Sequence, residues 1–219
     1  NFDLEVRHVC AHKYTPVGWN NKSELGLSIG CYYDYRDTCI HWFDVYTLEE
    51  TMRGFVDMGA LLVSFNGISF DFPIMRGLLR WSIHKETASQ STDSPIPQSL
   101  INKHGARMLL CDAFRLLCAS SYDILAEILE ADPDRKFEHG LNSLNTIAQA
   151  NGLSAKFSYG LQFSRNWRNR KYADVLNYCQ NRVYKTKALF ELVLQHDGVL
   201  LLGDGLPITL PLPILQGAH

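Results

Sequence analysis

The sequence predicts a single α/β domain with a mixed five-stranded sheet that is antiparallel at its beginning and carries helices on both faces. Two β-prone runs, 25–33 and 39–45, flank a polar turn. A run that is apolar except for Ser64, 60–65, is typical of a strand buried on both faces, and apolar residues recur every three or four positions from 172 to 195. The 219 residues, 46% of them hydrophobic, are enough for one sizeable core over 1–219.

The first part of the chain predicts strands and then a helix. Phe2–Val6 is a β-prone run that we expect to form a short strand, and the polar residues 34–38 favour a hairpin between the two strands that follow. Thr47, followed three residues later by Glu50, matches a capping box, so a helix should begin there. Gly59 should end it.

The middle of the chain alternates core elements with a polar segment. Asn66-Gly67 predicts a turn after the buried run, and the next helix should carry Asp71 at its start. Residues 83–106 are rich in Ser, Thr, Gln, Pro and Lys, a composition that predicts a flexible insertion. A further strand is expected at Arg107–Cys111.

The last part predicts helices and an extended end. Short helices are expected over 122–129 and 143–150, the second with Ser143 as its N-cap. The periodic segment Tyr172–Gln195 should be the longest helix. Residues 198–219 alternate apolar residues with Gly and Pro, so we expect an extended C-terminal arm that packs on the core or on a partner.

Composition limits the classes of partner. The formal net charge of -2 gives no global reason to expect a polyanion, so any nucleic-acid site must be a local patch. The six cysteines are scattered without the spacing of a zinc site, and no apolar run approaches the roughly 20 residues of a membrane helix. Several cysteines lie inside apolar runs, as buried free thiols do, so we expect an intracellular protein, cytoplasmic or nuclear, with no membrane partner.

Three acidic residues are candidates for one metal site. Asp3 and Glu5 are two apart on a predicted strand, so the side-chain period of two puts both carboxylates on the same face. Such a pair repels itself unless a cation neutralises it, although a lone pair is more often an exposed strand edge. Asp71 follows a buried strand at the start of a helix, and ligands of α/β sheets bind at that carboxyl edge.

These residues resemble the motifs of the DEDD 3′→5′ exonucleases. Phe2 to Glu5 is similar to motif I, Asn66 to Pro73 is similar to motif II, and the helix with Tyr178 and Cys179 is similar to motif III of the tyrosine branch. That branch includes the proofreading domains of family B DNA polymerases. The resemblance covers most of residues 1–195 and implies a ribonuclease H-like fold.

The resemblance also implies roles. Asp3 would bridge two divalent ions, Glu5 would bind one of them, and Asp71 would hold the other, largely through water. Mg²⁺ or Mn²⁺ is expected, because both prefer oxygen ligands, and two such ions about 4 Å apart can promote phosphodiester hydrolysis. Tyr178 would orient the attacking water; without motifs I and II it would be interpreted as an amphipathic core tyrosine.

One position departs from the family. Motif III is Tyr-x-x-x-Asp, but four residues after Tyr178 this chain has Arg182. Four helical residues bring Arg182 back to the Tyr178 face, so we expect its side chain to reach toward Glu5 or Asp3. A guanidinium there cannot be deprotonated and would occupy the place of one ion.

A basic segment before the long helix is the candidate nucleic-acid surface. Phosphate contacts are expected from Arg165, Arg168, Arg170 and Lys171, and Trp167 between them could stack on a base. A solvated polar loop is the alternative interpretation of this segment. The motif II resemblance adds Asn66 to the residues that face the nucleic acid.

Two functions follow from these patterns. The first is a metal-dependent 3′→5′ exonuclease that acts on single-stranded DNA or RNA ends. The second is a catalytically degenerate ribonuclease H-like module that binds nucleic acid or a protein partner, because Arg182 replaces the motif III Asp. A transposase or integrase on the same fold fits the motifs poorly. Asp112 is expected to cap a helix, and the eight histidines show no ligand spacing.

Overall fold

The computed structural model describes residues 27, 29–88, 98–133, 142–153 and 165–213, which form a mixed α/β structure. The strands of this described part pair as three two-stranded sheets. The five-stranded sheet is therefore not seen as such, and the expected strand Phe2–Val6 lies outside the described residues. Among the described helices, none is both long and apolar enough to cross a membrane.

The expected hairpin is confirmed. Strand β1 (Gly30–Asp34) pairs antiparallel with β2 (Cys39–Phe43) around the polar turn. Side chains alternate across β1: Tyr32 packs edge-on against Phe55, with ring centroids 4.8 Å apart, whereas Tyr33 faces Tyr184 on the opposite side. The hairpin is thus held between two helices.

Helix α1 (Leu48–Asp57) begins and ends where the sequence indicated, but its first turn is capped differently. Thr47 occupies the N-cap position without a side-chain capping bond; its hydroxyl accepts a hydrogen bond of 3.0 Å from the backbone N–H of Asp44 instead. The capping-box prediction is therefore wrong in its bonding. Gly59, with φ of 57°, follows the C-cap as expected, because the left-handed region costs a glycine little.

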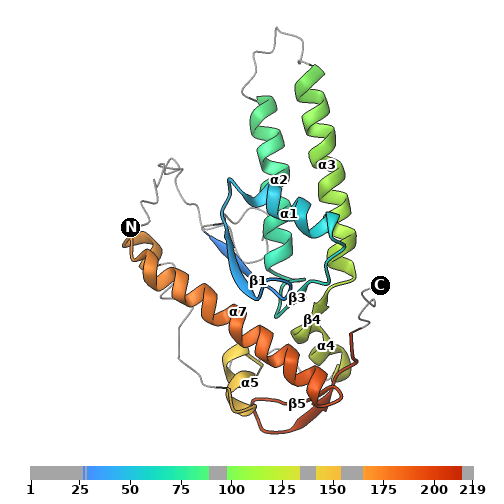
Figure 1. Cartoon of the computed structure of the whole chain (residues 1–219), viewed down its shortest axis with the longest axis vertical. Coiled ribbons are helices and arrows are strands. Elements are labelled where there is room, and N and C mark those ends of the chain that lie inside the picture. The colour runs from blue at the N-terminus through green and yellow to red at the C-terminus, as the bar shows by residue number, and fades with distance from the viewer. Residues whose placement is uncertain (1–26, 28, 89–97, 134–141, 154–164, 214–219) are drawn as a thin grey trace.

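Two long helices, α2 (Asp71–Ala88) and α3 (Gln98–Ala119), lie side by side and project from the rest of the molecule (Figure 1). They correct two predictions. Residues 83–88 complete α2 and 98–106 begin α3, so the described parts of the predicted insertion are helical. Residues 89–97 lie outside the described residues. Arg107–Cys111 is part of α3 and is not a strand.

The physical reason for this correction is the apolar spacing beyond residue 111. Leu110, Phe114 and Cys118 are buried and recur every four residues, which is the period of one helix face. The run 107–111 resembled a strand only when it was considered alone. Asp112 consequently lies on an exposed position in the middle of α3 and does not cap a helix.

A short parallel pair follows. Strand β3 (Val63–Ser64) pairs with β4 (Tyr122–Asp123), and α4 (Ile124–Ala131) starts directly behind β4. The helix expected over 122–129 is therefore displaced by two residues. Helix α5 (Leu144–Ala150) confirms its prediction, because the Ser143 hydroxyl accepts from the Thr146 N–H at 3.2 Å.

The chain continues with the longest helix, α7 (Tyr172–Gln195), at the predicted bounds. After α7 the described chain forms a hairpin of β5 (Val199–Leu201) and β6 (Pro207–Thr209), so the expected arm turns back on itself within 198–213. Its inward residues Leu200, Leu202 and Leu210 are buried, as packing on the core requires.

The described core consists of two clusters. One joins β4, α4, α5, α7 and the C-terminal hairpin around Ile124, Ile147 and Leu189. The other joins β2, α1, α2 and α3 around Met52 and Phe114. The chain passes from the first cluster to the second between Phe65 and Phe72, so the loop 66–71 lies where the two clusters meet.

Candidate functional site

The loop between β3 and α2 is held by the carboxylate of Asp123, which is 1% exposed at the end of β4. One oxygen accepts from the backbone N–H of Asn66 at 2.8 Å and the other from that of Ile68 at 2.9 Å. The hydroxyl of Ser64 donates to the same carboxylate at 3.1 Å. Asp123 also caps α4, because the N–H groups of Leu125 and Ala126 donate to it.

The sequence of this loop suits its backbone. Asn66 has φ of 70°, a left-handed conformation that asparagine tolerates better than most residues. A Cβ added to Gly67 would lie 2.6 Å from the side chain of Ser64, so only glycine fits there without displacement. The carbonyl of Gly67 then accepts from the N–H of Phe72 at 2.9 Å, which starts α2 in a fixed direction.

Asp71 opens α2, as expected, and its side chain reaches solvent. Desolvation by the surrounding protein raises the pKa of Asp71 to about 6, with a further increase from the negative charge of Asp123. The positive charge of Arg182 and a backbone hydrogen bond act in the opposite direction and lower this pKa. Near neutral pH the group is a carboxylate in a place that disfavours its charge, so a cation beside it would be stabilised.

Helix α7 supplies the other side groups of the site. The Arg182 guanidinium lies over the Tyr178 ring, 5.9 Å from its centroid, so the two side chains share one face of α7 as predicted. The charge of Arg182 acts on Asp71. Whether it also reaches Asp3 or Glu5 stays a prediction, because both acids lie outside the described residues.

The sequence analysis missed three further polar side chains of this region, those of Lys185, Asn145 and Asp123. Lys185 is 8% exposed and donates to the side-chain oxygen of Asn145 on α5 at 2.6 Å. Burial and the nearby Arg182 lower the pKa of Lys185. Asp123 could have been found, because an Asp directly before the apolar run 124–129 is an N-cap signal, but its bonds to the loop 66–68 carry no local signal.

The basic segment is only partly arranged for nucleic acid. Arg165, Arg168, Arg170 and Lys171 are exposed, as a phosphate-binding surface requires. Trp167 is half-buried and packs edge-on against Tyr172, with ring centroids 5.4 Å apart, so it does not present a free face like that of an isolated surface aromatic. A polar cavity of about 330 Å³ lies here, lined by Arg165, Asn166, Asn169, Lys171 and Asp174.

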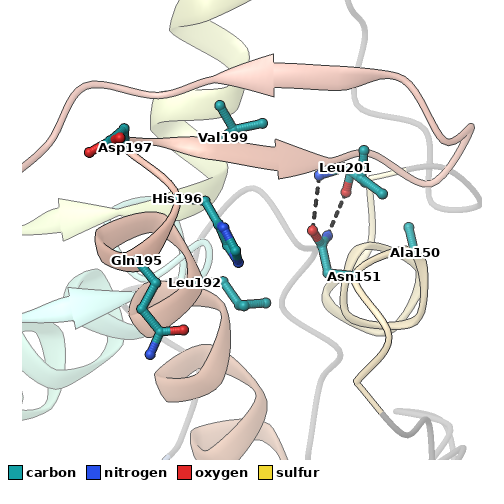
Figure 2. A pocket seen from close by; sticks show the side chains of 8 residues that line it. All are labelled: Ala150, Asn151, Leu192, Gln195, His196, Asp197, Val199 and Leu201. Carbon is teal, nitrogen blue, oxygen red and sulfur yellow. Dashed lines mark hydrogen bonds between the residues drawn. The ribbon is translucent and has the colours of Figure 1, made fainter.

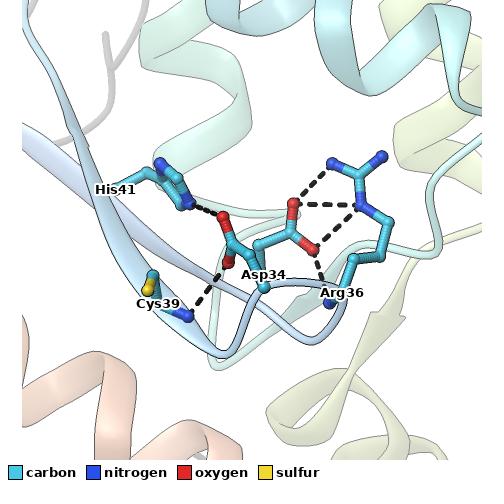
Figure 3. Close-up of polar contacts among 5 residues, drawn as sticks. Asp34, Arg36, Cys39 and His41 are labelled. Carbon is cyan, nitrogen blue, oxygen red and sulfur yellow. Dashed lines mark hydrogen bonds and ion pairs between the residues drawn. The ribbon is translucent and has the colours of Figure 1, made fainter.

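Two other features belong to the framework. On the β1–β2 hairpin, ligand atoms of Asp34, Asp37 and His41 lie within 4.8 Å of one another. The hairpin uses these groups itself: Asp34 pairs with Arg36 (Figure 3). Asp37 accepts from the Cys39 N–H and contacts His41 at 2.7 Å. The pairing with Arg36 lowers the pKa of Asp34 to about 2.

A cavity of about 600 Å³ lies at the far end of α7 (Figure 2). The side-chain amide of Asn151 bonds there to both backbone groups of Leu201, at 2.7 and 3.0 Å, and so satisfies the free edge of β5. Tyr178 and Arg182 are ten or more residues away along α7, which is about 15 Å. We therefore treat this cavity as separate from the candidate site.

The chain matches no protein-family model, no curated protein and no solved structure when its sequence and fold are compared with them.

Asp123 should be essential for stability. Asp123→Ala removes every acceptor of the loop 66–68 and the cap of α4, so the free energy of unfolding should fall by about 3 kcal/mol or more. Asp112→Ala, at an exposed position of α3, is the control and should change it by less than about 0.5 kcal/mol. Urea unfolding measures both; a loss below about 1 kcal/mol for Asp123→Ala would show that the loop keeps its shape without this carboxylate.

Asp71 should impose a pH dependence on stability. Its pKa is higher in the folded state than in the unfolded chain, so between about pH 4 and 6 the folded state binds more protons, and stability falls as pH rises. Asp71→Asn lacks this loss and should gain in stability relative to the wild-type protein across that window. Urea unfolding at pH 4, 5, 6 and 7 tests this, with Asp112→Asn as the control; a constant difference between Asp71→Asn and wild type would contradict it.

Proposed function

We propose that this protein is a metal-dependent 3′→5′ exonuclease of single-stranded DNA or RNA ends, with a ribonuclease H-like fold of the DEDD tyrosine branch. One observation carries the proposal. Asp71 at the start of α2 and the Tyr178–Arg182 face of α7, far apart in the sequence, come close enough for Arg182 to shift the pKa of Asp71. Motifs II and III of the resemblance require this meeting.

The donor set suits a hard cation. Asp71 is an exposed carboxylate whose surroundings disfavour its negative charge, and Asp3 and Glu5 would complete the ligands of Mg²⁺ or Mn²⁺. The ions would activate water and stabilise the leaving 3′-oxygen. Asp123 contributes no ligand, because its oxygens accept hydrogen bonds from the loop and from α4.

The residues of the chain itself would bind and orient. Tyr178 is half-buried, beside Arg182, and its hydroxyl would hold the attacking water by a hydrogen bond. Asn66 is the first residue of the loop that positions Asp71, and it would contact the nucleic-acid strand being cut. The exposed cations Arg165, Arg168, Arg170 and Lys171 precede the same helix and would hold the phosphates upstream.

Arg182 also supports the second candidate, a silent binding module. Its charge already offsets part of the cost of ionising Asp71, which is what a metal ion would do. In this alternative the site binds a phosphate or a protein carboxylate and cuts nothing. The exonuclease and the silent module predict different effects of replacing Arg182 on metal affinity and turnover.

Arg182→Asp should strengthen metal binding and turnover. The change restores a fourth carboxylate on the Tyr178 face and reverses the local charge by two units, so Mn²⁺ affinity should rise about tenfold or more. Calorimetric titration measures affinity, and hydrolysis of a labelled single strand with Mn²⁺ or EDTA measures rate. Arg182→Gln, which removes the charge without adding a ligand, should gain less.

A second control, Asn177→Asp, adds a carboxylate at an exposed position elsewhere on α7 and should change neither quantity. If Arg182→Asp gains neither affinity nor rate, the silent module replaces the exonuclease. A wild-type protein that already cuts as fast as the variant would mean that Arg182 does not compete with the ions.

The basic segment should make binding of single strands salt-sensitive. Replacing Arg165, Arg168 and Arg170 with Ala removes up to three phosphate contacts, so the slope of log K against log salt should flatten by about 2. Fluorescence anisotropy with a labelled single strand measures it. Arg115→Ala, an exposed arginine on α3, is the control. An unchanged slope in the triple variant would make the segment a solvated loop.

A further inference from the structure

Two free thiols lie against each other beside the candidate site. Cys31 on β1 and Cys179 on α7 are half-buried on two elements that pack on each other. A hydrogen bond between the two thiols is the largest influence on the pKa of each. The packing of strand β1 on α7 is consistent with this contact. Tyr33, two residues after Cys31, lies 6.5 Å from Tyr184 between ring centroids and within 4.9 Å of the Lys187 ammonium, so this face of β1 packs on α7.

The remaining described cysteines are placed differently. Cys111 and Cys118 are buried on one helix, seven residues apart, which is about 10 Å and too far for a disulfide without movement of the backbone. Cys39 is exposed on the outer strand of the hairpin. Among the cysteines that the structure describes, the pair of Cys31 and Cys179 thus joins two different elements.

We propose that Cys31 and Cys179 are a reversible redox pair, oxidised by low-molecular-weight disulfides, whose disulfide tethers β1 to α7 beside Asp71, Tyr178 and Arg182. Cys179 directly follows Tyr178 on α7 and lies within the electrostatic reach of Arg182 and Asp71. A bond at Cys179 therefore restrains the helix at the point where it presents its site residues.

The electrostatics assign a different role to each thiol. The hydrogen bond from Cys31, and then the charge of Arg182, lower the pKa of Cys179, whereas the same contact and burial raise the pKa of Cys31. Because the thiolate is the nucleophile, Cys179 attacks first. Cys31 keeps its proton until the second step.

The exchange is balanced with a low-molecular-weight disulfide as oxidant. The Cys179 thiolate attacks one sulfur of that disulfide, forms a mixed disulfide and releases one thiolate, which takes up the Cys179 proton. Cys31 then loses its proton and attacks the Cys179 sulfur, so the second small thiol leaves with that proton. Two protein thiols are oxidised and one small disulfide is reduced to two thiols.

The covalent test uses the full chain and oxidised glutathione as the probe. After incubation, non-reducing peptide mapping by mass spectrometry should find one linkage, between the Cys31 and Cys179 peptides, and dithiothreitol should reverse it. Cys39→Ser is the matched control on the same hairpin and should form the linkage equally. Cys31→Ser should stop at a glutathione adduct on Cys179. A linkage between other cysteines, or none in excess probe, overturns the proposal.

Thermal unfolding provides a second readout that does not need activity. A disulfide across this long stretch of chain should raise Tm by roughly 5 °C or more in the wild-type protein and in Cys39→Ser, but not in Cys31→Ser. A linkage that lowers Tm would mean that the thiols meet only in distorted molecules, which also overturns the proposal.

The regulatory meaning rests on the proposed nuclease. Oxidised and reduced forms should differ in turnover at least threefold, and the difference should vanish in Cys31→Ser. If the linkage forms and both forms cut equally, regulation of the site is excluded. If neither form cuts under any metal condition, the nuclease proposal fails while mapping and Tm still decide the tether.

Discussion

The carboxylate of Asp123 is the constraint on which the candidate site depends. It accepts hydrogen bonds from three segments: Ser64 at the end of β3, the loop 66–68, and the first turn of α4. Asp123 itself is 1% exposed, so these donors compensate a carboxylate that is withdrawn from water. They hold the loop that leads to Asp71 at the start of α2. A residue with no catalytic role in our proposal thus helps to fix the place of Asp71.

The charges around Asp71 follow from the same geometry. Asp123 cannot be moved away without breaking the loop, so its negative charge is a fixed part of the surroundings of Asp71. Desolvation acts in the same direction, and Arg182 offsets these effects only in part, since the pKa of Asp71 is still raised to about 6. The single guanidinium of Arg182 therefore does not fully compensate the cost of ionising Asp71. A further positive charge beside Asp71 would still stabilise its carboxylate, so Arg182 reduces the stabilisation that a bound cation would give without abolishing it.

The sequence predicted the elements whose signals are local. The hairpin at 30–43 has its polar turn, α5 has Ser143 as a cap, and α7 has an uninterrupted apolar stripe, and each formed as expected. Composition misled where a polar surface was mistaken for a loop, at 83–88 and 98–106, because exposed helix faces contain the same residue types. At the site, the turn signal at Asn66-Gly67 correctly put Asp71 at a helix start, and the four-residue helical spacing correctly put Arg182 beside Tyr178. The role of Asp123 and the meeting of Cys31 with Cys179 depend on tertiary packing, which no spacing in the sequence encodes.

Helix α7 connects these features and is anchored unevenly. Leu189, Phe190 and Val193 in its second half are part of the first core cluster and fix that end. The aromatic contact with β1 falls in this second half too, since Tyr33 packs against Tyr184 and the Lys187 ammonium. The first half, which carries Tyr178 and Arg182, lies outside both clusters, although Val175 in its first turn is buried. There the side chain of Cys31 on β1 interacts with Cys179, next to Tyr178. The residues that hold Tyr178 and Arg182 near Asp71 are therefore different from those that anchor α7 in the first core cluster.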